Sequence, residues 1–264
     1  PFVAGYLAMT AGNPYGALGS CLAVVGLTVE FAWSKRWTPV RRTLLGGIAV
    51  GLVAPLTYLP LVLTQSVTYR NDSKIGNSGL MVPGLGDLLN ASTPSFAAWV
   101  DAFEHPYLTV PATYLAWYAL PLLPWLRYRA IVDALVSRMA VPVYAVLGLA
   151  FSVGPSEAWM FRWPLRVVPL FVLPTAILLA IALTQGLAGD FRRRRAVGSL
   201  LLILGGAYLA EATRPDLVKA HAASVLLVGI LTAATVAVWL RWPRRGAACR
   251  RPFAPRESGS SRAG

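Results

Sequence analysis

The sequence predicts an all-α protein: a polytopic bundle of transmembrane helices, with short interfacial helices in one outer loop. Hydrophobic residues make up 56% of the 264 residues and charged residues only 13%, against roughly 25% charged in soluble domains. The charges are also clustered, so that Thr43–Gln65 and Val167–Leu187 contain none. Stretches of about 20 apolar residues are long enough to cross a hydrocarbon core of roughly 30 Å.

Hydropathy predicts about seven spans, preceded by an apolar stub at Pro1–Met9. Because the chain begins inside this stub, we expect it to be the C-terminal fragment of a longer protein. Two of the spans, the fourth and the sixth, are short, and they either extend into flanking residues or stop inside the bundle. The predicted spans are Tyr15–Trp33, Thr43–Thr64, Pro111–Leu126, Met139–Val153, Val167–Leu187, Ala196–Ala210 and Ala220–Leu240.

The distribution of basic residues predicts the orientation. One set of connections, together with the tail, contains 18 Lys and Arg residues, and the opposite set contains 6. By the positive-inside rule the first set is cytoplasmic. The net charge of +13 is therefore a topology signal and indicates no nucleic-acid partner. We expect a multi-pass protein of the bacterial cytoplasmic membrane, with a transmembrane domain over residues 1–240 and a disordered basic cytoplasmic tail over 241–264.

The longest connection, Ser66–Val110, falls on the outer side, and a loop of this length is usually functional or disordered. Thr93-Pro94 is typical of a helix start, and the aromatic residues that follow recur at helical spacing. We therefore predict an amphipathic interfacial helix over Pro94–Glu104 that buries Phe96, Trp99 and Phe103. Just before it, the segment Val82–Leu89 is typical of a turn followed by a second, brief apolar helix.

The same loop carries most of the polar chemistry of the outer side. Its candidate ligand-binding residues are Arg70, Asp87, Asp101 and His105. Each could contact a sugar or act as a general base, and each is equally compatible with a solvated surface residue. No metal-ligand spacing such as HxxxH or CxxC is present, so we predict no metal site, and nothing in the sequence indicates a cofactor.

A second outer feature is the segment Gly154–Arg166, where Arg162 and Arg166 lie four residues apart before an apolar span. If the helix begins early enough, they share one of its faces. Arginine beside a helix N-terminus favours binding of a phosphate or carboxylate. The structural alternative is an ion pair in which Glu157 neutralises an arginine.

With its Phe-Arg-Trp-Pro-Leu-Arg motif at 161–166, the chain resembles bacterial membrane proteins related to GT-C glycosyltransferases, including the YfhO-like group. The similarity covers roughly 43–187 and includes Leu115-Ala116-Trp117-Tyr118 and the proline-rich run that follows. It implies transfer of a sugar from a polyprenyl-phosphate donor to a cell-envelope glycan or lipid on the outer face. It also implies a catalytic acid in a first outer loop upstream of Pro1, so no catalytic residue is assigned here. Arg162 and Arg166 would hold the donor phosphate.

Two other function classes remain open from the sequence. A transporter or flippase of a lipid-linked or anionic solute would place polar groups and broken helices near the midplane, and the spans contain several prolines. A non-catalytic membrane scaffold is the third class. In each case the expected partners include the surrounding membrane lipids.

Overall fold

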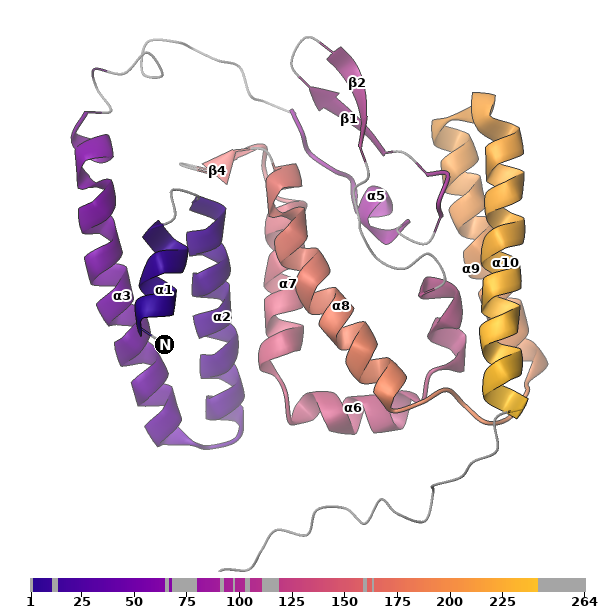
Figure 1. Ribbon diagram of the computed structural model, residues 1–264, viewed down its shortest axis with the longest axis horizontal. Helices are drawn as coiled ribbons and strands as arrows, with labels where there is room; N and C mark the ends of the chain where they lie inside the picture. Colours follow the sequence, from indigo (N-terminus) through magenta and orange to yellow (C-terminus); the bar gives the residue numbers. More distant parts are fainter. Residues whose placement is uncertain are drawn as a thin grey trace, which may run out of the picture.

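The computed structural model describes residues 2–10, 14–64, 67, 80–90, 93–96, 98–102, 105–110, 119–158, 161–162 and 164–241. Its helices form three neighbouring groups (Figure 1). The first group contains α1 (Phe2–Thr10), α2 (Pro14–Trp33) and α3 (Trp37–Leu63), which pack against one another. The second contains α6 (Tyr128–Val136), α7 (Ala140–Ser152), the 3-10 helix η3 (Pro164–Val167) and α8 (Val168–Thr184). The third contains the 3-10 helices η2 (Leu120–Trp125) and η4 (Pro215–Leu217), with α9 (Arg193–Thr213) and α10 (Val218–Arg241).

The helices of the third group present apolar side chains outward along their length. Leu201, Leu226 and Ile230, for example, are 64%, 66% and 65% exposed. A soluble protein would bury such side chains, whereas a lipid bilayer is an apolar solvent for them. By helix length and hydropathy, the chain is a multi-pass membrane protein.

The number of candidate spans is four to five, which corrects the predicted seven. Among the described residues, four stretches are long and apolar enough to cross a membrane, and α6 with α7 would make a fifth as a pair bent by 96°. The helix α3 covers the predicted second span, but some of its side chains lie outside the description and it is not among the four. The four are Tyr15–Trp33, Pro164–Thr184, Arg193–Thr213 and Pro215–Arg241.

Length and proline explain the overcount. The described part of the predicted span Pro111–Leu126 forms only the 3-10 helix η2, where Pro121 and Pro124 lack the N–H groups that an α-helical ladder needs. The 13 residues of α7 rise only about 20 Å. The predicted short span Ala196–Ala210, by contrast, extends on both sides into the 21 residues of α9.

The predicted interfacial helix Pro94–Glu104 is wrong. Its middle forms the strand β1 (Ala98–Ala102), which pairs antiparallel with β2 (His105–Val110) and has a register shift between Val100 and Ala102. The spacing of the aromatic residues suggested a helix. The β-branched and aromatic residues downstream supply a partner strand, and pairing with it selects a strand over a helix in a short segment that is compatible with both. The predicted brief helix is confirmed as α5 (Leu85–Leu89).

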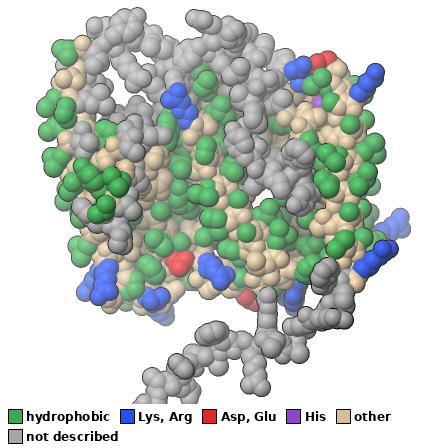
Figure 2. Space-filling view, in the orientation of Figure 1, with side chains coloured by type: hydrophobic (Ala, Val, Ile, Leu, Met, Phe, Trp, Pro, Cys, Tyr) green, Lys and Arg blue, Asp and Glu red, His purple; other side chains and the backbone are tan. Residues whose placement is uncertain are grey.

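Basic side chains gather at one end of the bundle, hereafter the basic end (Figure 2). This end contains the α2–α3 turn, the amphipathic helix α6, the start of α9 and the end of α10. A core cluster that includes Leu122, Trp125 and Val236 joins η2 to α10 there. The opposite end carries α5 and both hairpins, and we call it the loop end (Figure 1). The basic connections counted in the sequence therefore lie at one end of the bundle, as the predicted orientation requires. Which side of the membrane this end faces stays a prediction.

Candidate functional site

The loop end is organised by a segment that we call the docked loop, the described residues 80–90 and 93–96. One side of it lies against η3 and α8. The Leu165 N–H donates to the Met81 carbonyl oxygen over 3.0 Å. Leu88 and Val168 are both 2% exposed, and Phe96 packs on the cluster that they form. The predicted burial of Phe96 is thus met in part, although the residue lies in a turn and not in a helix.

The other side of the docked loop lies on α9. The Asn90 side chain, 4% exposed, donates from Nδ2 to the Gly206 carbonyl oxygen over 3.2 Å. Its Oδ1 accepts from the Thr93 hydroxyl over 2.8 Å. A side chain on Gly206 would collide with this pair, because its Cβ would overlap Thr93 Oγ1 and lie 2.9 Å from Asn90 Oδ1. The glycine therefore allows the loop to approach the helix backbone.

A buried histidine ties the docked loop to α10. His221 is 4% exposed; its Nε2 lies 2.8 Å from the Arg214 carbonyl oxygen and its Nδ1 lies 2.8 Å from Ser95 Oγ. Because a carbonyl oxygen only accepts, Nε2 carries a proton, and in the neutral ring the Ser95 hydroxyl donates to Nδ1. The histidine thereby orients the turn of Thr93–Phe96, closed by a 3.0 Å bond from the Phe96 N–H to the Thr93 carbonyl oxygen.

Asp87 is the described loop carboxylate whose environment changes its acidity. Its Oδ2 accepts from the Gly84 N–H over 2.6 Å. Burial raises the pKa of Asp87 above the ordinary value of 3.8, and the hydrogen bond from Gly84 partly opposes that rise. A carboxyl group that holds its proton more tightly than usual is typical of general acids, and it is equally produced by packing in a folded loop.

The two arginines of the predicted phosphate site do not share a helix face, which corrects that expectation. Arg162 lies in the strand β4 (Phe161–Arg162), and Arg166 lies in η3. In the ladder with β3 (Glu157–Ala158), Glu157 is the backbone partner of Arg162. Cross-strand neighbours of opposite charge stabilise a hairpin, so this register is compatible with the alternative of an ion pair. Arg166 is exposed immediately before α8.

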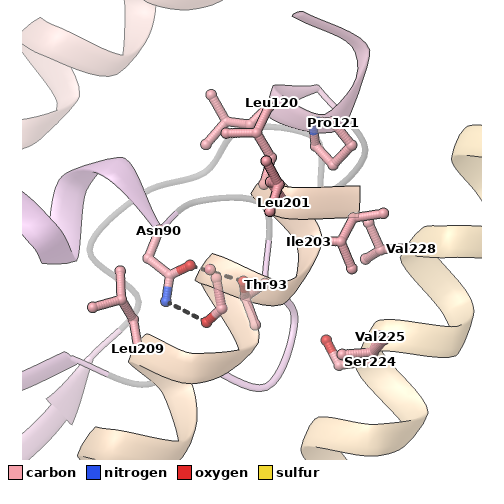
Figure 3. A pocket seen from close by; sticks show the side chains of 13 residues that line it. Asn90, Thr93, Leu120, Pro121, Leu201, Ile203, Leu209, Ser224, Val225 and Val228 are labelled. Carbon is pink, nitrogen blue, oxygen red and sulfur yellow. Dashed lines mark hydrogen bonds between the residues drawn. The ribbon is translucent and has the colours of Figure 1, made fainter. Parts of the chain in front are cut away.

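A cavity of about 210 Å³ lies beneath the docked loop, between η2, α9 and α10 (Figure 3). Asn90 and Thr93 line it from the loop, and Ser224 lines it from α10. The other lining residues are glycine or apolar: Leu120, Pro121, Leu201, Leu202, Ile203, Gly205, Gly206, Leu209, Val225 and Val228.

Three predicted site residues stay untested by this geometry. Arg70 lies outside the described residues. Asp101 falls in β1 and His105 begins β2, but their side chains are outside the description. In the part of the chain that is described, no group of three His, Cys, Asp or Glu side chains could hold a metal ion.

Sequence reasoning missed Asn90, His221 and Ser224. A signal for the last two was present, since His221, Ser224 and Val228 recur at the spacing of one helix face in an otherwise apolar span. Asn90 carried no comparable signal, because its burial depends on a loop that folds back onto a distant helix. Comparison of the chain with models of protein families, with curated proteins and with solved structures finds no match.

Proposed function

We propose that the chain is a membrane-embedded, glycosyltransferase-like protein that binds a polyprenyl-phosphate-linked sugar at the loop end, for glycosylation of a cell-envelope glycan or lipid. The observation that carries the proposal is the position of Arg166. It is exposed at the entrance to α8, at the end of the bundle that is otherwise poor in basic residues. Positive-inside topology does not explain an arginine there, whereas an anionic ligand would.

The Arg166 side chain, and not a free helix end, supports binding of an anion at this position, because η3 runs directly into α8 and Pro169 in the first turn has no N–H. Arg166 lies two residues before the first residue of α8, and Arg162 precedes it on β4. A guanidinium can bind a phosphate through two parallel hydrogen bonds, and one such group contributes about 1.5–3 kcal/mol.

The test measures binding of polyprenyl phosphate to the full chain in lipid nanodiscs. Arg166→Ala should weaken binding about 10- to 100-fold, and Arg166→Lys should restore only part of it, because an ammonium group lacks the planar fork. The matched control is Lys219→Ala, which removes another exposed basic residue from the loop end. Equal affinities for Arg166→Ala and Lys219→Ala would overturn the proposal.

A second measurement separates ligand binding from structural pairing at Arg162. If Glu157 and Arg162 act as an ion pair, Arg162→Ala should lower the melting temperature, and the double change with Glu157→Ala should restore part of it. If Arg162 contributes to phosphate binding, Arg162→Ala should weaken the binding of polyprenyl phosphate whether or not Glu157 is also replaced.

Transport or flipping of a lipid-linked or anionic solute is the second candidate. Buried polar residues along α10, namely His221, Ser224 and Thr232, favour it, since polar groups inside a membrane bundle often mark a solute path. Reconstitution into vesicles distinguishes the two functions. A fluorescent polyprenyl-phosphate lipid should bind without crossing the bilayer if the protein is transferase-like, and should cross if it is a flippase.

A further inference from the structure

The cavity beneath the docked loop contains a hydroxyl that the fold leaves without a partner. Ser224 is 5% exposed, and none of the described residues forms a hydrogen bond with it. In Figure 3 its hydroxyl oxygen is directed toward the space between α10, α9 and the docked loop. Because Ser224 lines the cavity, its hydroxyl is available for a hydrogen bond to a molecule bound there.

Several other hydroxyl residues in the helices of this protein bond to their own helix. Ser152 donates to the Gly148 carbonyl oxygen over 2.8 Å, and Thr175 donates to the Phe171 carbonyl oxygen over 2.7 Å. On α10 itself, Thr235 donates to the Leu231 carbonyl oxygen over 2.7 Å. This bond to the preceding turn is the ordinary arrangement for Ser and Thr inside a helix. Ser224 differs because its side chain turns toward the cavity.

Asn90 contributes further hydrogen-bonding capacity at the loop side of the same cavity. Its carboxamide has two N–H donors and two acceptor lone pairs. The bonds with Gly206 and Thr93 use one donor and one lone pair. One donor and one lone pair therefore remain for a ligand, on a side chain that is 4% exposed.

The remaining walls restrict the chemistry of that ligand. Among the described residues that line the cavity there is no Lys, Arg, Asp or Glu, so a phosphate or carboxylate would lose its hydration without gaining a counter-charge from them. The walls are otherwise aliphatic, and α9 and α10 expose apolar side chains to the surroundings. The volume of about 210 Å³ holds about seven groups of the size of a water molecule.

We propose that this cavity is a binding site for a neutral lipid: the segment of an acyl chain that bears an ester carbonyl or a hydroxyl oxygen. The oxygen bonds to the Ser224 hydroxyl, the Asn90 carboxamide offers a second polar contact at the loop side, and the adjoining methylene groups occupy the aliphatic space between α9 and α10. The surrounding bilayer supplies such molecules directly to these helices. This site differs in both position and charge from the proposed phosphate site at Arg162 and Arg166.

The test uses a monoacylglycerol with a diazirine in its acyl chain, irradiated with the full chain in nanodiscs, followed by mapping of the labelled peptides. The wild-type protein should be labelled on α9 and α10, and unlabelled monoacylglycerol should compete. Gly205→Leu fills the cavity: Gly205 lines it, and a Cβ added there meets no atom within 4 Å. This change should reduce labelling at least tenfold.

Gly229→Leu is the matched control. Gly229 is also a helical glycine, on α10, whose added Cβ meets no atom within 4 Å, and it does not line the cavity. Its labelling should equal that of the wild type. Equal labelling of the Gly205→Leu and Gly229→Leu proteins would overturn the proposal, because the label would then report only general contact with lipid.

A second variant tests the same site if Gly205→Leu fails to fold. Ser224→Ala removes no bond within the protein, so it should fold normally and weaken competition by monoacylglycerol about 3- to 10-fold, the loss expected for one hydrogen bond. Ser152→Ala, which removes a bond remote from the cavity, should leave competition unchanged. Equal competition by the long-chain fatty acid anion and by monoacylglycerol would overturn the assignment of a neutral ligand.

Discussion

The helices on the two sides of the docked loop are packed in opposite ways. In the α2–α7–α8 region, glycines let the helix backbones touch: a Cβ on Gly148 would lie 2.7 Å from the Leu170 carbonyl oxygen, and one on Gly26 would lie 2.7 Å from that of Ala140. In the α9–α10 region, a Cβ on Gly205 would meet nothing within 4 Å. Glycine thus serves close approach between helices in the first region, whereas Gly205 faces open space in the second.

The buried polar groups differ in the same way. In the close-packed region, Glu30 accepts from the Ala140 N–H at the start of α7 over 3.0 Å, and Ser152, 0% exposed, is bonded to the preceding turn. In the open region, Thr232 Oγ1 is buried without a hydrogen-bond partner, and the Ser224 hydroxyl lines the cavity with no partner among the described residues. Close packing with satisfied polar groups indicates a structural scaffold, whereas a cavity with unsatisfied polar groups indicates a binding region.

The largest expected effect contrasts the two glycines. Gly148→Ala places a methyl group against backbone that cannot rotate away, and overpacking of this kind costs about 1–3 kcal/mol. Gly205→Ala enters open space and removes a flexible residue from a helix, so it should stabilise by up to about 1 kcal/mol. Thermal unfolding in detergent measures both. Equal melting temperatures for the two variants would contradict the difference in packing.

The next comparison concerns two buried serines on neighbouring helices. Ser199 accepts from Trp125 Nε1 over 2.9 Å and donates to the Pro121 carbonyl oxygen over 2.6 Å. Ser199→Ala leaves a buried indole N–H unsatisfied and should cost about 1–3 kcal/mol of stability. Ser224→Ala should change stability by less than about 0.5 kcal/mol. A larger loss of stability for Ser224→Ala than for Ser199→Ala would contradict the hydrogen bonding described for these two serines.

A smaller effect is expected where Glu30 closes the start of α7. Glu30→Ala removes an acceptor from the first helical N–H, and loss of such a cap costs about 1 kcal/mol. Glu30→Gln retains an acceptor oxygen and should recover most of the loss. Unfolding in detergent measures the stability of both variants. If Glu30→Gln is as unstable as Glu30→Ala, the charge of Glu30 matters more than its hydrogen bond.

The smallest effect belongs to the docked loop, which bridges the two regions. Because the folded loop raises the pKa of Asp87 above 3.8, the native state binds the proton more tightly than the unfolded chain. The contribution of Asp87 to stability is therefore present below pH 3.8 and is lost as the pH rises through the folded pKa. Asp87→Asn, which keeps an acceptor for Gly84, should remove this slope. Hydrogen exchange of Leu85–Asn90 across pH measures it, and an unchanged slope would assign the effect to another group.

Part of the site followed from the sequence and part did not. The brief helix that the structure places at Leu85–Leu89 was predicted from the turn residues before it, because proline and glycine act locally. The helix predicted over Pro94–Glu104 failed because a strand pairing with His105–Val110 is a tertiary choice between two local patterns. The approach of Asn90 to Gly206 joins residues 116 positions apart, and periodicity says nothing about such contacts.

The sequence by itself determined the class of protein, since apolar stretches with few charges favour a membrane whatever their packing, and it determined which connections are basic. The tertiary structure decided how many helices are long enough to span, and the described part of the predicted span Pro111–Leu126 forms only a short 3-10 helix. It also decided that Arg162 and Arg166 fall on different elements, and that a loop, α9 and α10 enclose a cavity with an unsatisfied hydroxyl. Class follows from composition because transfer to an apolar solvent is additive over residues, whereas a site requires particular groups to meet, and that depends on the packing of the whole chain.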